Sequence, residues 1–190
     1  MITTDDAALA ERLRHLRHQG MSLSDYARHG APPTQFETYD EVGYNHRITD
    51  IQAAIGLVQL DRLAGILERR RAVAARYDAR LAVHPIFTPP HVPPGLTPNW
   101  QSYQLRLHVH IGWSRNEVMD RLFELGVPTR RGVMASHLEA PYRHAAPQLP
   151  RTESTAASTL QLPVHPGLTP EQQDRVLTAL DLLTAETAGR

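Results

Sequence analysis

Hydrophobic residues in the first half of the chain recur with the three-to-four-residue spacing of helices. The first such stretch predicts a helix that follows the capping residues Thr4 and Asp5 and ends at Gly20. Its apolar face is formed by Leu9, Leu13 and Leu16. The stretch from Met21 to Asn45 has little periodicity and predicts a long connecting loop, a kind of segment that often carries function.

A second and stronger helical pattern begins at Thr49. The sequence Thr49-Asp50-Ile51-Gln52 is typical of a capping box, in which the side chains of Thr49 and Gln52 each accept the other's backbone N–H. The apolar period then continues to Leu81 without a proline. Because Gly65 lies in the middle of this run, the sequence predicts either two helices joined by a bend there or one long bent helix.

The second half alternates between strand and helix patterns. Residues 85–98 hold six prolines and predict an irregular linker, after which apolar and polar residues alternate over 103–111 as in a half-buried strand. Ser114 and Glu117 predict another capping box, for a helix that runs through Leu125. An extended stretch, a short helix, a short strand and a last helix follow, at residues 127–135, 152–159, 160–163 and 169 onward. This order predicts a compact α/β domain.

The composition narrows the chemistry that the side chains can perform. The 190 residues carry 20 basic and 20 acidic side chains, and this balance argues against a nucleic-acid or membrane-surface partner. There is no cysteine, and every one of the 20 basic residues is an arginine. Because arginine stays protonated, no side chain of this sequence can form a Schiff base. With no signal-peptide pattern and no apolar run long enough to span a bilayer, we expect a cytoplasmic protein.

Clusters of basic residues and histidines have simpler explanations than a site. The run Arg69 to Arg71 has acidic neighbours and favours a solvated helix face over a nucleic-acid patch. Two histidine pairs share a strand face or a helix face, namely His108 with His110 and His15 with His18. No acidic third ligand stands at a fixed spacing from either pair, so we expect no metal site.

The loop at residues 43–47 is a candidate anion site. It brings a glycine, an amide donor and an arginine, namely Gly43, Asn45 and Arg47, to the N-terminus of a capped helix, where backbone N–H groups favour anions. The alternative is that these residues only cap and pack the helix. The residues alone leave both interpretations open.

Residues 43–60 resemble a long signature of the DegT/DnrJ/StrS family of sugar aminotransferases, G-Y-N-x-R-x-T-[DE]-x-Q-A-A-x-G-x-x-Q-L. Further resemblances to family motifs are spread along the chain, at residues 13–21, 69–77, 126–130, 138–142 and 162–169. Members of the family use pyridoxal phosphate to aminate keto groups on nucleotide-linked sugars. The resemblance implies an α/β structure that is the C-terminal part of a type I aminotransferase fold. Residues 1–64 would be a remnant of the large cofactor domain, and residues 65–190 the small C-terminal α/β domain.

The same resemblance implies that the Schiff-base lysine is absent. In the family this lysine lies shortly before a strand, and residues 1–5 are similar to the tail of that strand, so we expect no catalytic residue in this chain. Asn45 matches the asparagine that reaches the cofactor phosphate of the neighbouring subunit, to which an amide can donate. Arg47 matches the signature arginine, for which two roles are open, supporting the loop or contacting the substrate, and His137 matches a histidine near the sugar-binding side. Both are expected substrate-binding residues.

We therefore expect the C-terminal portion of a nucleotide-sugar aminotransferase, which moves an amino group from glutamate or glutamine to a keto-sugar nucleotide. Without a lysine the chain should be inactive alone. One alternative is a non-catalytic dimerisation partner that completes the active site of a full-length homologue. Another is a decaying remnant that exposes apolar faces. The expected partner is a second copy, a full-length homologue or a separate N-terminal half.

Overall fold

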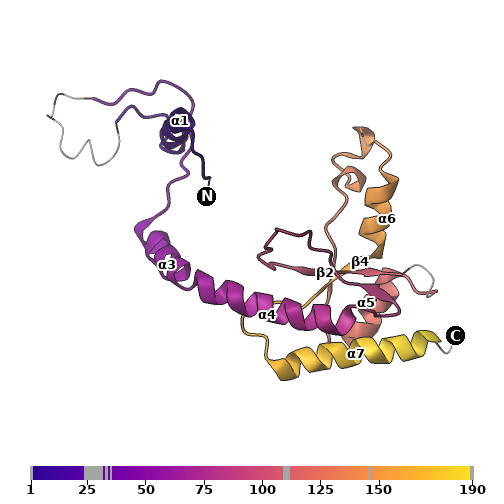
Figure 1. Cartoon of the computed structure of the whole chain (residues 1–190). Coiled ribbons are helices and arrows are strands. Elements are labelled where there is room, and N and C mark those ends of the chain that lie inside the picture. Colours follow the sequence, from indigo (N-terminus) through magenta and orange to yellow (C-terminus); the bar gives the residue numbers. More distant parts are fainter. Residues whose placement is uncertain are drawn as a thin grey trace. The chain divides into compact units, whose positions relative to one another are not determined.

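The computed structural model describes residues 2–23, 32, 34, 36–108, 112–145 and 147–188 (Figure 1). The chain divides into two compact units, residues 1–61 and 62–190. The described residues of the first unit form two helices, α1 (Ala7–Arg17) and α3 (Asp50–Asp61). The second contains α4 (Leu63–Leu81), β1 (Phe87–Thr88), β2 (Tyr103–Leu107), α5 (Arg115–Glu124), β3 (Arg130–Arg131), η2 (Ser136–Leu138), η3 (Arg143–Ala145), α6 (Pro150–Ser158), β4 (Thr159–Leu162) and α7 (Pro170–Ala188). None of the described helices is long and apolar enough to cross a membrane.

The second unit is built on an antiparallel sheet with the strand order β1-β2-β4-β3. Its central pair places Leu105 of β2 opposite Leu160 of β4. Along β2, alternate residues are buried, which confirms the half-buried strand predicted from the sequence. The end of that predicted strand, at residues 109–111, lies outside the described residues.

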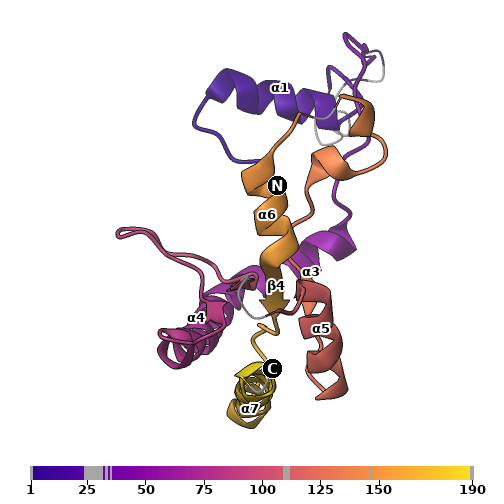
Figure 2. The same cartoon turned by 90° about the vertical axis from the view of Figure 1, so that its right-hand side faces the viewer.

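The apolar face of this sheet packs against α4, α5 and α7, which lie on the same side of it. Figure 2 shows these three helices around β4, with α6 projecting on the opposite side of the sheet. The alternation of strands and helices along residues 103–188 and the mixed α/β class are as predicted. The largest fully buried side chains of this core include Tyr77, Tyr103, Leu105, Leu160, Leu180 and Leu183.

Two buried tyrosines tie α4 to the sheet through their hydroxyl groups. Tyr77 donates to the carbonyl of Pro163 at 3.0 Å, and Tyr103 donates to Asp78 Oδ1 at 2.6 Å. Burial raises the pKa of both tyrosines far above its ordinary value, so each remains a protonated donor. These two enclosed hydroxyl groups are therefore satisfied.

The cap of α1 differs from the predicted one. Asp6, rather than Thr4 or Asp5, accepts the backbone N–H groups of Ala8 and Leu9, at 2.9 and 3.0 Å. The helix ends at Arg17 instead of continuing to Gly20. Residues 2–5 form no strand, because an extended segment needs a neighbouring strand and no described residue provides one.

The break in the long helical run falls at Arg62, between α3 and α4, and not at Gly65. Gly65 keeps helical geometry, which costs only about 0.5–1 kcal/mol relative to alanine and does not by itself end a helix. The proline-rich segment also differs from the expected linker, because it contains β1. Phe87 is 1% exposed and pairs with Leu107. A two-residue strand is too short for its alternation to be visible in the sequence.

Truncation of a core leucine of α7 should destabilise the second unit. Leu180 is fully buried, so Leu180→Ala is expected to lower the free energy of unfolding by about 2–5 kcal/mol. The measurement is urea denaturation followed by circular dichroism. Leu182 lies on the same helix but is 49% exposed, and Leu182→Ala should change the same quantity by less than about 0.5 kcal/mol. Equal losses in the two variants would contradict the described core.

Candidate functional site

Backbone hydrogen bonds attach the loop before α3 to the C-terminal end of α1. The Tyr44 N–H donates to the Leu16 carbonyl at 2.7 Å, and the His46 N–H donates to the Arg17 carbonyl at 3.1 Å. The last carbonyls of a helix have no partner within it, so the loop supplies donors that α1 lacks. We call residues 43–47 the signature loop. Its position is set by the main chain of α1.

Two glycines allow the main chains to approach this closely. A side-chain carbon added to Gly43 would collide with the backbone nitrogen of Gly20, and one added to Gly20 would collide with the carbonyl oxygen of Glu41. Gly20 also has a φ of 72°, in the left-handed region that favours glycine. Both positions therefore require glycine for a steric reason.

The extended backbone of the signature loop brings Asn45 and Arg47 to one side. Asn45 bridges His18 as in an antiparallel ladder, and in extended chain the side chains of residues two apart point the same way. The Arg47 Nε donates to Asn45 Oδ1 at 3.0 Å. On the other side, the rings of Tyr44 and His46 stack with centroids 5.1 Å apart.

The hydrogen bond from Arg47 to Asn45 determines which end of the Asn45 amide points outward. The amide oxygen is directed to Arg47, so the NH₂ group, on the opposite side of the same plane, points away from it. Within the described part of the chain, that NH₂ group donates to no other residue. Asn45 is exposed and can offer its two N–H bonds to an external acceptor, such as a phosphate oxygen.

The N-terminus of α3 is less suited to an anion than the sequence predicts. The predicted capping box is present: Thr49 N–H donates to Gln52 Oε1 at 2.9 Å, and Gln52 N–H donates to Thr49 Oγ1 at 3.3 Å. The first residue of the helix, Asp50, adds a negative charge at its positive end. The candidate anion donor is therefore the loop amide of Asn45.

His137, the third candidate residue, lies in the second unit and is held by a carboxylate. It belongs to η2, its side chain is 9% exposed, and its Nε2 lies 3.1 Å from Glu153 Oε1 of α6. The same carboxylate accepts the backbone N–H of Leu149 at 3.2 Å. These two hydrogen bonds, that of His137 first, lower the pKa of Glu153 below its ordinary value.

Of the three predicted residues, the structure brings Asn45 and Arg47 together, while His137 belongs to the other unit. Sequence reasoning missed Glu153, which is sixteen positions from His137. The one signal that could have identified it is its place in the first turn of a helix, where carboxylates bind free N–H groups.

The histidine pairs do not form a metal centre among the residues that the structure describes. No group of three histidine, aspartate or glutamate side chains there is arranged to hold a metal ion. Both ring nitrogens of His108 have protein partners, Thr88 Oγ1 at 2.7 Å and the Pro85 carbonyl at 2.9 Å. His110 lies outside the described residues.

Comparison with known proteins identifies a consistent set of relatives. The model of the DegT/DnrJ/EryC1/StrS aminotransferase family matches residues 1–181. The chain is 38% identical over 184 residues to the GDP-perosamine synthase of Caulobacter vibrioides, a match covering 95% of this chain and 47% of that protein.

Solved structures give the same result. The aminotransferase TlmJ of Streptoalloteichus hindustanus superposes with a TM-score of 0.81 at 31% identity, over 96% of this chain and 47% of that one. DesV of S. venezuelae, solved in complex with a ketimine intermediate, gives a TM-score of 0.81 at 32% identity, over 95% and 45% of the two chains. The chain thus spans about half the length of these relatives and has part of their fold.

Substitution of Gly43 should detach the signature loop from α1. In Gly43→Ala the new methyl group would collide with Gly20, so the amides of Tyr44 and His46 should lose hydrogen-exchange protection. The matched control is Gly56→Ala in α3, where an added carbon meets no atom within 4 Å. That control should leave loop exchange unchanged and stabilise the helix by about 0.5–1 kcal/mol. Unchanged protection in Gly43→Ala would contradict the described contact.

Removal of the His137 ring should raise the pKa of Glu153 toward its ordinary value, because the carboxylate loses its main hydrogen-bond donor. The measurement is a carbon-detected NMR titration of the Glu153 carboxyl in the parent and in His137→Leu. A carboxyl with a depressed folded-state pKa stabilises the fold above its unfolded-state pKa, and this contribution is lost as pH falls through the folded value. His144→Leu, at an exposed histidine, is the control. Identical titrations in all three proteins would refute the contact.

Proposed function

This chain belongs to the DegT/DnrJ/EryC1/StrS aminotransferase family, and we propose that it supplies the C-terminal portion of a nucleotide-sugar aminotransferase. The reaction would transfer an amino group from glutamate or glutamine to a keto-sugar nucleotide. The names of the relatives support this substrate class, since they are a GDP-perosamine synthase and aminotransferases. The observation that carries the proposal is the signature loop, which holds the Asn45 amide with its donors outward.

The residues of this chain fit one end of pyridoxal phosphate, the cofactor of this family. The Asn45 NH₂ group suits the phosphate, because it is exposed and its amide oxygen is already bound to Arg47. The aldehyde end needs a lysine, and all 20 basic residues of this chain are arginine. When bound, the cofactor supplies the electron sink for amino-group transfer. The lysine that holds it would come from another polypeptide segment.

Arg47 and His137 are proposed to act on the substrate side. Arg47 would orient the Asn45 amide and place its guanidinium beside the bound substrate. The bond from His137 Nε2 to Glu153 fixes the ring and leaves Nδ1 as the atom that can contact a sugar hydroxyl. Neither residue is assigned a proton-transfer role.

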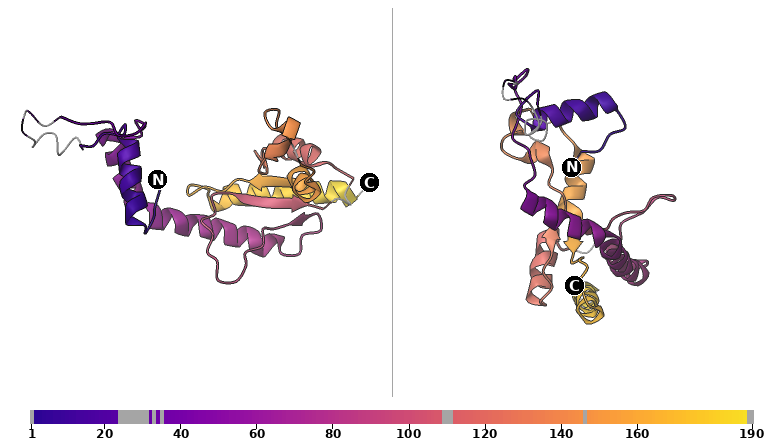
Figure 3. Two further views of the ribbon diagram at one scale, coloured as in Figure 1. Left: turned by 90° about the horizontal axis from the view of Figure 1, so that it is seen from above. Right: turned by 90° about the vertical axis from the view of Figure 1, so that its left-hand side faces the viewer.

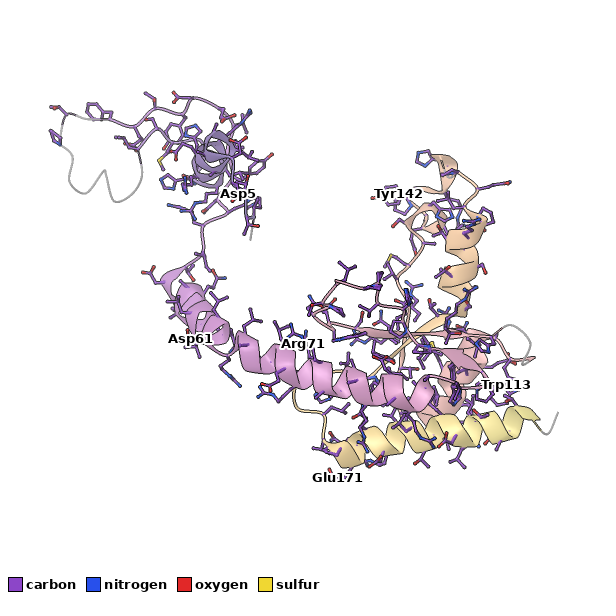
Figure 4. All side chains as sticks on the ribbon, in the orientation of Figure 1. Asp5, Asp61, Arg71, Trp113, Tyr142 and Glu171 are labelled. Carbon is purple, nitrogen blue, oxygen red and sulfur yellow. The ribbon has the colours of Figure 1, made fainter. Side chains whose placement is uncertain are left out.

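The exposed surface of α3 supports a partner. None of its residues is buried, although it is mostly apolar: Ile51 is 76% exposed and Leu57 is 64% exposed. In Figure 4 none of the other described elements of the first unit covers this helix, which ends at the labelled Asp61. A helix that is apolar all round normally lies inside a protein, so we propose that a second polypeptide packs around it. A second copy, a full-length homologue and a separate N-terminal half are the candidates.

The second candidate function is a non-catalytic pairing module, favoured by the absence of lysine. Such a module would lend Asn45 to the active site of a full-length homologue. It differs from the leading proposal in one respect, since the homologue would be active without it. A decaying remnant would bind neither the cofactor nor a homologue.

The test is co-expression of this chain with a full-length, lysine-bearing member of the family. We expect the chain alone to show no turnover with pyridoxal phosphate, glutamate and a keto-sugar nucleotide, and the pair to purify as a complex. In that complex, Asn45→Asp should weaken cofactor retention by about tenfold or more, because it keeps the acceptor for Arg47 but replaces the donor with a negative charge. Cofactor retention is measured by absorbance after gel filtration.

Asn116→Asp provides the matched control. Asn116 Oδ1 also accepts a hydrogen bond from an arginine, since Arg115 Nε donates to it at 2.8 Å. Asn116 belongs to α5 of the second unit. This variant should retain the cofactor as the parent does. Turnover by the chain alone would overturn the need for a lysine-bearing partner, and equal retention in both variants would overturn the role of Asn45.

A further inference from the structure

The outer face of the sheet in the second unit is polar and lies opposite the helices of the core. Directly opposed residues of antiparallel strands share a face, so Gln104 and Arg130 both lie on the same side as Gln161. By the same rule Arg106 lies on the side of Thr159, two residues from Gln161. Figure 3 shows this face from above, with α6 standing nearly end-on over it.

Two arginines of this face have uncommitted guanidinium groups. Arg106 and Arg130 are exposed, and neither forms a hydrogen bond or ion pair with another residue that the structure describes. No outward position of the four strands is acidic: the residues there are Thr88, Gln104, Arg106, Arg130, Thr159 and Gln161. The face therefore combines two free positive charges with the side-chain amides of Gln104 and Gln161, whereas the Thr88 and Thr159 hydroxyl groups are bonded within the protein.

The arginine pairs elsewhere in the unit are different. Arg76 is paired with Asp174 at 2.5 Å, and Arg80 with Asp181 at 2.6 Å, so both of these α4 arginines have an acidic partner on α7. An anion bound between Arg106 and Arg130 would give both guanidinium groups a partner.

The spacing of Arg106 and Arg130 selects the size of the anion. Strand β4 lies between them, so they are two strand spacings apart across the sheet. They are also offset by two residues along the strands. Together these offsets place their Cα atoms about 12 Å apart. Arginine side chains that converge from such positions can each bind a different phosphate of a diphosphate with their planar forks. Gln104 and Gln161 lie between them and can donate to the bridging region.

We infer that the outer sheet face, through Arg106 and Arg130, binds the diphosphate of a nucleoside diphosphate or nucleotide sugar. This inference rests on the proposed function, since a nucleotide-sugar substrate carries that group. It assigns the substrate diphosphate to the second unit and leaves the cofactor phosphate to Asn45.

The experiment is a calorimetric titration of the whole chain at low ionic strength with GDP, inorganic pyrophosphate and inorganic phosphate. We expect GDP and pyrophosphate to bind at least about tenfold more tightly than phosphate, because only a diphosphate engages both arginines. The double substitution Arg106→Gln with Arg130→Gln should weaken pyrophosphate binding by about tenfold or more. The control removes the same charge from α4, at Arg69→Gln with Arg71→Gln (Arg71 is labelled in Figure 4), and should change binding by less than about twofold.

NMR titration of the parent chain with pyrophosphate tests the same site without a variant, in case the double variant does not fold. Pyrophosphate should shift the side-chain amide signals of Gln104 and Gln161. Equal loss of binding in both double variants, shifts confined to other residues, or no binding of any probe would overturn the inference. Binding that depends on Arg47, and not on Arg106 and Arg130, would overturn it while leaving the proposed aminotransferase function standing. A pair that forms no cofactor-retaining complex would overturn the proposed function separately.

Discussion

The backbone contact between the signature loop and the carbonyl end of α1 is the constraint on which the first unit depends. Its hydrogen bonds join main-chain atoms, so they fix the path of the loop whatever side chains α1 carries. The two glycines bring the backbones too close for a methyl group, which removes other ways of seating the loop. Once the path is fixed, the extended backbone places Asn45 beside Arg47, and their hydrogen bond orients the amide. A flexible loop would lose conformational entropy when it binds an anion, and this loss would weaken the binding.

The two faces of the sheet in the second unit differ in polarity. The inner face is apolar and is enclosed by α4, α5 and α7, with Tyr77 and Tyr103 bonded to internal acceptors. The outer face has polar residues and carries no part of that core. Its exposed arginines, Arg106 and Arg130, can therefore be exchanged without opening a cavity, whereas a change on the inner face costs packing energy. The polar network around His137 and Glu153 lies outside the core as well, at the start of α6.

Local patterns predicted most of the fold because they act over three or four residues. The capping boxes that begin at Thr49 and Ser114 are present, each with both of its hydrogen bonds. The alternation of apolar and polar residues along β2 matches the alternation of buried and less buried side chains. What the sequence did not predict depends on contacts across long separations. The two residues of β1 are a strand only because Leu107 pairs with Phe87, and Glu153 meets His137 only after α6 has folded. The orientation of the Asn45 amide likewise could not be predicted from the sequence, because it depends on the hydrogen bond from Arg47. The resemblance had identified only the residue.

The exposed apolar surface of α3 and the lack of lysine both support the proposed partner polypeptide. A helix of 12 residues has little stability in water without packing against a neighbour, and no residue of α3 is buried. The signature loop runs directly into this helix, so a partner that covers α3 would also stabilise the segment that carries Asn45 and Arg47. In the proposed assembly, the polypeptide that brings the lysine would be the one that buries this surface. Cofactor binding would then be coupled to association, because the phosphate donor and the lysine would come from different polypeptides. This coupling would keep an unpaired chain from competing for the cofactor.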